Sequence, residues 1–356
     1  MPYALRIFVV ILVALLAWSL WCYYLALRQD WAIATLEQAG GFVTYQTPEA
    51  WSVEKLTGYP WRGFQRVASV TLPVGQLLPN RPFAAVGDLT GIRKLVAYGP
   101  GLTDDSLRQL SHAHTLEELN LDSPHITDRG LASLQGLTGL TELALDRTQV
   151  TRAGLASLQG LRKLRILVLS GVTLHDADLE QLGQYPYLQG LNFDARCITD
   201  AGLEALGGCP HLQSLNLSDS QISDAGMLAM GRLQQLVSLD LSSTAVTDSG
   251  MVPVGQLKRL QSLHLRQTSL SHTGLAALQE LRDLQELSLD RTQLTDMGLS
   301  HLRNFKKLQV LTISNTAITD AGLLHLSGLS GLTQLDLDGT SITDAGLEHL
   351  QSLTRL

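Results

Sequence analysis

Apolar residues recur along most of this chain with a fixed period of 24 residues. The last full repeat, Leu332–Arg355, reads LTQLDLDGTSITDAGLEHLQSLTR, and the same pattern appears 24 and 48 residues earlier. Numbered from its first leucine, each repeat alternates apolar and polar residues around positions 4 and 6, which are Leu335 and Leu337 here. That alternation predicts a strand with one buried face. Positions 16, 19 and 22 are apolar at helical spacing, so each repeat predicts a short strand followed by a short helix.

The repeats follow one another without insertion or deletion. Eleven of them begin at Ile92, Leu116, Leu140, Leu164, Leu188, Leu212, Leu236, Leu260, Leu284, Leu308 and Leu332. A constant period in this range is typical of a solenoid, and the motif L-x-x-L-x-L-x-x-T-x-I resembles the leucine-rich repeat. The resemblance implies an α/β solenoid over residues 92–356, shaped as a curved horseshoe. Its parallel strands line the concave face and its helices the convex face.

The start of each predicted helix carries its own signals. Position 12 is Thr or Ser in ten of the eleven repeats, as at Thr343, and this hydroxyl can cap free N–H groups. An aspartate at position 13, such as Asp344, suits the positive end of a helix dipole. Glycine at position 15 is unfavourable inside a helix and indicates close packing against the neighbouring repeat. Thr at position 9 matches the family residue that bonds backbone groups in the turn after the strand.

The chain begins with an apolar run. Residues Ile7–Leu27 are 21 consecutive uncharged residues between Arg6 and Arg28, which is long enough to span a bilayer. Four aromatic residues cluster near its end, as in an interfacial belt: Trp18, Trp21, Tyr23 and Tyr24. We predict an uncleaved single-pass anchor over residues 1–28, with a signal peptide and a buried helix as alternatives. The short N-terminal tail favours an extracytoplasmic solenoid.

Residues 29–91 are predicted to connect the anchor to the regular repeats. Asp30–Ala39 reads as a continuing helix that ends at Gly40-Gly41, and Phe42–Tyr45 as a strand. An irregular segment follows, marked by Pro48, Trp51, Pro60 and Trp61. Residues 67–91 are interpreted as a degenerate first repeat that completes an N-terminal cap. The order of anchor, helix and 24-residue repeats resembles the membrane-anchored leucine-rich repeat proteins of planctomycete bacteria.

The charge and cysteine content argue against nucleic-acid binding and against a disulfide or metal site. The chain has 26 basic and 33 acidic residues, and residues 92–356 carry 20 and 28 of them. A nucleic-acid partner is not predicted because no basic stripe is present. The three cysteines do not form a disulfide framework or a metal-ligand pair. We therefore predict no cofactor and no metal.

The concave face is predicted to be polar and shallow, with positions 2, 3, 5, 7 and 8 facing solvent. Such a mixed-charge surface is typical of docking to a protein, and a glycan is also possible. The candidate binding residues are Asp122, Asp146, Arg147, Asn192, Asp194, Asn216, Asp240, His264, Arg266, Asp290, Arg291, Asp336 and Asp338.

Two other functions stay open. Asp240, His264 and Ser288 occupy position 5 of consecutive repeats, in the order of a hydrolytic acid, base and nucleophile. An open row of strands offers neither a pocket nor oxyanion donors, so a hydrolase is disfavoured. Leu356 would begin a twelfth repeat, and an uncapped edge there would favour a self-associating structural protein of the envelope. The preferred prediction is a non-enzymatic interaction module.

Overall fold

The computed structural model describes residues 2–46, 66–75, 81–89 and 91–356, without the side chains of residues 2–11 and Arg81. Pro48, Trp51, Pro60 and Trp61, which were predicted to mark an irregular segment, lie outside the described residues. The chain divides into two compact units, Met1–Ala144 and Leu145–Leu356. Each unit is described by itself.

Unit 1 begins with one long helix and continues into a small sheet. β1 pairs antiparallel with β2, and β2, β3 and β4 are parallel in chain order. The elements are α1 (Pro2–Gln38), β1 (Phe42–Tyr45), β2 (Val67–Pro73), α3 (Arg81–Val86), β3 (Lys94–Tyr98), α4 (Asp104–Gln109), the 3-10 helix η2 (Leu110–His112), β4 (Glu118–Asp122) and α5 (Asp128–Ala132). The predicted helix end at Gly40-Gly41 and the predicted strand Phe42–Tyr45 are both confirmed.

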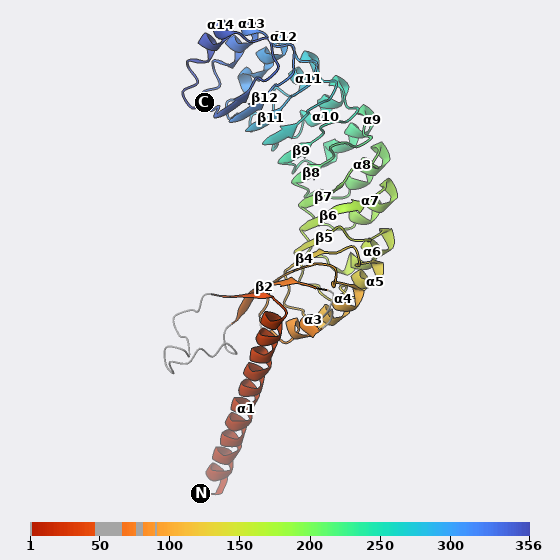
Figure 1. Cartoon of the computed structure of the whole chain (residues 1–356), viewed down its shortest axis with the longest axis vertical. Helices are drawn as coiled ribbons and strands as arrows, with labels where there is room; N and C mark the ends of the chain where they lie inside the picture. Colours follow the sequence, from red (N-terminus) through yellow and green to blue (C-terminus); the bar gives the residue numbers. More distant parts are fainter. Residues whose placement is uncertain (1, 47–65, 76–80, 90) are drawn as a thin grey trace. The chain divides into compact units, whose positions relative to one another are not determined.

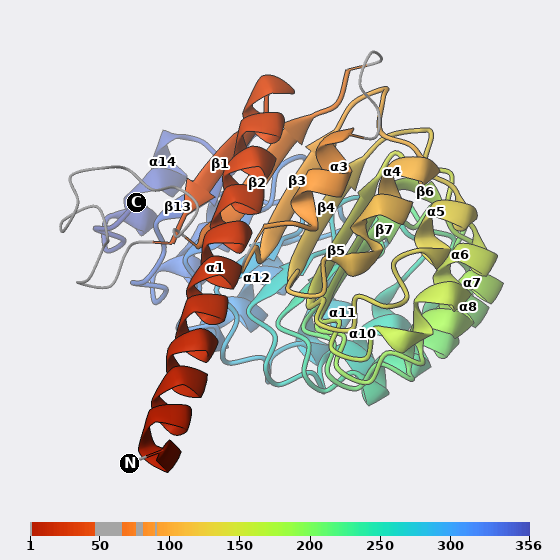
Figure 2. The same ribbon diagram turned by 90° about the horizontal axis from the view of Figure 1, so that it is seen from below.

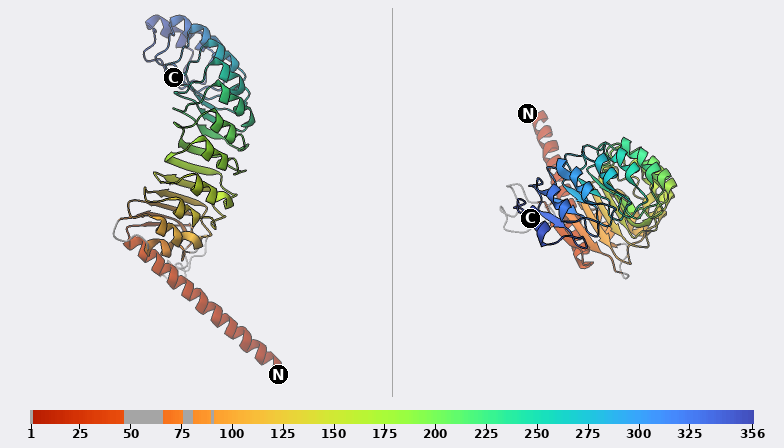
Figure 3. Two further views of the ribbon diagram at one scale, coloured as in Figure 1. Left: turned by 90° about the vertical axis from the view of Figure 1, so that its right-hand side faces the viewer. Right: turned by 90° about the horizontal axis from the view of Figure 1, so that it is seen from above.

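α1 has two different halves. Among its described side chains, none from Leu12 to Leu25 is buried. The C-terminal half contacts α3 and β1 and buries Ala26, Gln29, Ala32, Ile33 and Leu36 at the spacing of one helix face. Figure 2 shows this half beside α3, and in Figure 3 the other half of α1 projects away from the rest of unit 1. The stretch Leu12–Leu25 is therefore left largely uncovered by the described part of the protein.

Unit 2 repeats one strand and one short helical segment. β5 (Glu142–Asp146) crosses the division between the units. The strands of unit 2 are β6 (Ile166–Thr173), β7 (Gly190–Asp194), β8 (Ser214–Asn216), β9 (Ser238–Asp240), β10 (Ser262–His264), β11 (Glu286–Ser288), β12 (Val310–Thr312) and β13 (Gln334–Asp336). They are parallel and neighbour one another in chain order, which confirms the predicted topology.

The helical segments form the other layer of unit 2. They are α6 (Arg152–Ser157), α7 (Asp176–Leu182), α8 (Asp200–Leu206), α9 (Asp224–Met227), α10 (Met251–Val254), α11 (His272–Ala277), α12 (Asp296–Leu299), α13 (Asp320–Leu323) and α14 (Asp344–Leu347). The 3-10 segments are η3 (Leu158–Gly160), η4 (Leu228–Arg232), η5 (Asp248–Gly250), η6 (Ser300–Asn304), η7 (Leu324–Leu326) and η8 (Glu348–Leu350). The stack curves with its strands on the concave side, as Figure 1 shows for unit 2.

The outer half of each repeat is shorter and tighter than the predicted single helix. In several repeats one turn of α-helix passes directly into a 3-10 segment, as α13 passes into η7. A 24-residue period leaves little room after the strand and its turn, and 3-10 geometry is common in such short segments. The leucines still meet in register: Leu263 pairs with Leu239 on one side and Leu287 on the other, and all three are buried.

Aspartate at position 13 has a role that its place at a helix start did not reveal. Its carboxylate accepts hydrogen bonds from the backbone N–H and the hydroxyl of position 12 in the next repeat. Asp224, for example, accepts from Thr247 N at 2.8 Å and from Thr247 Oγ1 at 2.6 Å. We call this row the aspartate ladder; its members include Asp104, Asp176, Asp200, Asp224, Asp248, Asp296 and Asp320.

The ladder explains the recurrent glycine at position 15. A Cβ at Gly226 would overlap Oδ1 of Asp200, and glycines at the same position face the preceding aspartate at other junctions. The predicted close packing between repeats is thus confirmed, and its cause is the carboxylate. The predicted hydroxyl caps are confirmed at Thr199 and Thr343 among others. At Thr319 the prediction was wrong: its hydroxyl donates to Asp296, as the capping hydroxyls do to their own aspartates, but it accepts no hydrogen bond from the start of the helix.

Candidate functional site

The concave surface is shaped by a sharp turn at position 8, which in six repeats follows shortly after the strand. Six residues there, Arg147, Asp219, Ser243, Gln267, Arg291 and Asn315, have φ between 53° and 58°. This left-handed conformation is uncommon outside glycine. It is held by the next repeat, as where Gln267 N donates to Asp290 O at 2.8 Å. The turn leaves the side chains of Arg147, Gln267 and Arg291 exposed.

Threonine at position 9 stabilises the same turn from within its own repeat. Thr244, Thr268 and Thr292 are buried, and each hydroxyl donates to the carbonyl three residues earlier at 2.7 Å. The prediction that this residue bonds backbone groups in the turn is confirmed. A fixed backbone means that the polar side chains of the surface are held on a rigid support.

One hollow opens on the strand side of unit 2. It has a volume of about 490 Å³ and is built from five consecutive repeats. Four predicted residues line it: Asp240, His264, Arg266 and Asp290. Small-molecule pockets are lined mainly by apolar groups, whereas most side chains here are charged, hydroxyl or amide groups. The hollow therefore suits part of a macromolecular surface better than an enclosed small molecule.

The hollow contains both signs of charge. The side chain of Arg266 is exposed and has no hydrogen bond or ion pair to another described residue, while its backbone carbonyl accepts from Ser243 N at 2.8 Å. Asp290 is instead fully engaged, accepting from Ser288 Oγ at 3.1 Å, Thr312 Oγ1 at 2.7 Å and Ser314 N at 2.8 Å. A partner would meet the free guanidinium of Arg266 beside a carboxylate that is already held in place.

Sequence reasoning missed several residues of this hollow. Asp219, Ser243 and Gln267 occupy position 8, and Glu286 occupies position 3. Residues at both positions were predicted to face solvent in every repeat. These four differ from the others only because their repeats are the ones that build the hollow. The sequence carries no further signal for them, because every repeat has residues at positions 3 and 8.

The position-5 row is present, but its hydrogen bonds do not connect the three residues. The register places His264 between Asp240 and Ser288. His264 Nε2 lies 3.0 Å from Ser262 Oγ, which also donates to Glu286 at 3.0 Å. Among the described residues no hydrogen bond joins His264 to Ser288 or Asp240. Ser288 lines the hollow, as predicted for position 5, but its side chain is largely covered by Asp290 and Thr312.

The remaining predicted residues lie outside this hollow. In unit 1, Asp122 ends β4. In unit 2, Asn192 and Asp194 lie on β7, and Asn216 ends β8. Asp146 ends β5, Arg147 and Arg291 follow their strands, and Asp336 and Asp338 are exposed at and after β13. A hydrogen bond from Arg196 lowers the pKa of Asp194, so this carboxylate is held charged.

Metal and thiol chemistry find little support in the described part of the chain. No group of three or more His, Cys, Asp or Glu side chains there could hold a metal ion. Cys22, Cys197 and Cys209 are free thiols, and burial raises the pKa of Cys209 to about 11. At ordinary pH Cys209 is therefore an uncharged core residue.

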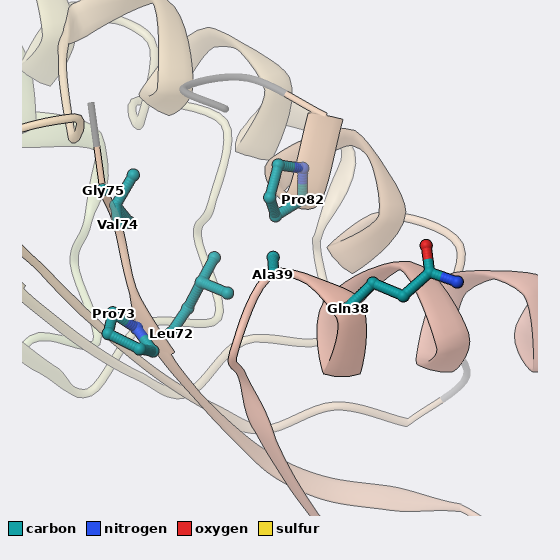
Figure 4. Close-up of a pocket in the computed structure, with 7 residues that line it drawn as sticks. All are labelled: Gln38, Ala39, Leu72, Pro73, Val74, Gly75 and Pro82. Atoms are coloured by element: carbon teal, nitrogen blue, oxygen red, sulfur yellow. The ribbon is translucent and has the colours of Figure 1, made fainter. Parts of the chain in front are cut away.

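A smaller apolar hollow lies within unit 1. Figure 4 shows it between the end of α1 and β2, lined by Gln38, Ala39, Leu72, Pro73, Val74, Gly75 and Pro82. Its volume is about 140 Å³. It offers no charged side chain to orient a ligand.

Comparison with known families identifies the repeats. Models described as "Leucine rich repeat" match residues 282–342 and, separately, residues 112–134, 208–231 and 233–255. These segments are leucine-rich repeats. A search of curated proteins gave no match.

Two solved structures that are similar to this chain share its fold. An internalin (inlF) from Listeria monocytogenes has a TM-score of 0.60 at 22% identity, covering 81% of this chain and 85% of the internalin. The plant peptide hormone receptor RGFR1, solved in complex with RGF2, has a TM-score of 0.50 at 20% identity, covering 80% of this chain and 46% of the receptor chain. At these identities the likeness concerns the fold alone.

Proposed function

We propose that this leucine-rich repeat chain is a non-enzymatic, membrane-anchored module that binds a protein partner on the strand side of its repeats. The observation that carries the proposal is the open polar hollow around Arg266, which five repeats build on a rigid backbone. The binding surface extends over the candidate residues outside the hollow, including Asp194, Asn216 and Asp338. The plant receptor offers a parallel, since its structure contains a peptide hormone.

The anchor is residues 1–28, followed by the cap over residues 29–91 and the repeats over residues 92–356. One N-terminal helix is long and apolar enough to cross a membrane, a property that secretion signals share. The exposed apolar half of α1 supports the anchor. In this proposal the solenoid is extracytoplasmic, and the order of the segments resembles that of planctomycete membrane-anchored proteins.

Site-specific photocrosslinking tests the binding surface. A photoreactive amino acid at Arg266 should form a discrete protein adduct in membranes of the source cell. The same group at Leu324, which is 53% exposed in η7, serves as the control and should form none. Equal labelling from both positions would refute binding on the strand side. An adduct that contains only carbohydrate would replace the protein partner with a glycan.

Two further measurements address localisation and catalysis. Protease added to spheroplasts should digest the repeats, and protection of the repeats would place them in the cytoplasm.

A fluorophosphonate probe tests for a reactive serine and should label the wild-type chain no more strongly than the Ser288→Ala variant. Labelling that Ser288→Ala abolishes would overturn the non-enzymatic assignment.

A further inference from the structure

Packing of the cap begins before the apolar run ends. α1 continues unbroken from Pro2 to Gln38, and Ala26 is the first described residue of it to be buried. Gln29, Ala32 and Leu36 continue the same buried face. The predicted membrane run ends at Leu27, so no linker separates it from the packed part of unit 1.

The length of the run fixes the level of the bilayer edge along α1. The 21 residues Ile7–Leu27 rise about 31 Å as a helix, close to the ~30 Å hydrocarbon core. Leu27 then lies at the edge of the core, and Arg28 is the first charge beyond it. Arg28 forms an ion pair with Asp88, which follows α3, and its guanidinium lies 5.8 Å from the centre of the Tyr24 ring. The turn at Asp88 is thereby held at the level of the bilayer edge.

The face of α1 opposite the packed residues remains apolar beyond Arg28. Leu27 is 48% exposed, and Trp31, one turn later, is 57% exposed. One helical turn places Trp31 about 6 Å beyond the hydrocarbon edge, in the layer that tryptophan prefers. The exposed Leu27–Trp31 face is continuous with the apolar run, so the same lipid that surrounds the run would cover it.

We propose that the first coil of the solenoid rests directly on the lipid surface, with Trp31 in the headgroup layer and the turn at Asp88 against it. This proposal rests on the membrane anchor. It adds a second lipid contact, and it makes the cap a rigid extension of the anchor.

Tryptophan quenching tests the contact. The full chain, with Trp18, Trp21, Trp51 and Trp61 replaced by Phe, is reconstituted into phosphatidylcholine vesicles whose acyl chains are brominated near the headgroup. Trp31 emission should be lost relative to unbrominated vesicles and lie at shorter wavelength than an aqueous tryptophan. The matched control adds Trp31→Phe and Leu324→Trp to the same background and should keep its emission.

A second variant covers the case in which four substitutions impair folding. Trp31→Phe alone, in the otherwise native chain, should remove a component of the tryptophan emission. That component is the one quenched by lipids brominated near the headgroup. Trp31 emission that iodide quenches and brominated lipid does not would overturn the proposal. Alkaline extraction of the same vesicles separates the two hypotheses: a chain that stays bound while Trp31 is unquenched keeps the anchor and loses the lipid contact, whereas a released chain loses both.

Discussion

At the scale of single residues, the close packing of successive repeats depends on the glycine at position 15 and the aspartate at position 13 of the preceding repeat. Gly226 leaves space for the carboxylate of Asp200, which accepts hydrogen bonds from Ser223 N and Oγ. We expect Gly226→Ala to lower the free energy of unfolding by about 1–3 kcal/mol, the usual cost of overpacking. Chemical denaturation of the full chain in detergent micelles measures it. Gly231→Ala is the control, because no described atom lies within 4 Å of its added Cβ, and equal losses in both variants would refute the argument.

The ladder also predicts sensitivity to acid. At Asp248, burial raises the pKa, but hydrogen bonds from Ser271 and Thr273 outweigh it, so the net shift is downward. A carboxylate with a depressed folded-state pKa stabilises the fold above its unfolded pKa of about 3.9. That stability is lost as pH falls through the lower folded-state value. Melting temperatures between pH 7 and 3 should therefore fall more for the wild type than for Asp248→Asn, and parallel curves would contradict the assignment.

At the scale of elements, the junction between the repeats that begin at Leu140 and Leu164 lacks the ladder. Arg152 takes the place of the aspartate and His175 that of the threonine, while Asp178 replaces the glycine and accepts from His175 N at 2.7 Å. Three side-chain links cross the junction instead: Arg152 to Glu180, Gln159 to Gln181, and Tyr185 to the Leu155 carbonyl. Two of these three links join exposed side chains, and the third, from Tyr185, is buried.

Because side-chain links replace the aspartate ladder at this junction, removing one of them should destabilise the junction and leave distant repeats unchanged. Tyr185→Phe removes the buried hydrogen bond from Tyr185 Oη to Leu155 O, 3.2 Å long. Its loss should cost about 0.5–1.5 kcal/mol and speed amide hydrogen exchange in α6 and α7 while leaving α11 unchanged. Tyr187→Phe is the matched control, because Tyr187 is 57% exposed and its ring stacks on His211. Faster exchange spread evenly over unit 2 would contradict a local junction effect.

Features that follow from the pattern within one repeat could be predicted from the sequence, whereas contacts between neighbouring repeats could not. Strands, buried leucines and hydroxyl positions follow from local periodicity, so Leu263 and Thr268 were placed correctly. The bond between Asp224 and Thr247 joins residues 23 positions apart, and only the superposition of neighbouring repeats reveals it. The left-handed turn at Gln267 and the burial of Ser288 likewise depend on the next repeat. The hollow around Arg266 could not be located because identical spacing gives every repeat the same concave positions.

At the scale of the whole molecule, the position of the chain depends on the apolar half of α1. Leu16 lies near the middle of the run and is 56% exposed. An arginine there should oppose membrane insertion by about 2.5–3.5 kcal/mol. We expect Leu16→Arg to lower the fraction of chain that resists alkaline extraction. Leu27→Arg is the control, since a long side chain at the edge of the run can extend its charge to the headgroups.

The size of the mature chain distinguishes an anchor from a secretion signal. An uncleaved chain should keep its first residues, as intact-mass measurement of the membrane fraction would show. Leu16→Arg would also impair a secretion signal, so that variant alone does not separate the two. With a secretion signal, however, the wild-type chain would be found as a shortened, soluble product. A shortened product cut near Leu27 would also remove Ala26, the first buried residue of the cap helix. Retention of the full chain with its cap folded is therefore the outcome that the packing of α1 favours, and a shortened, soluble product would contradict the anchor.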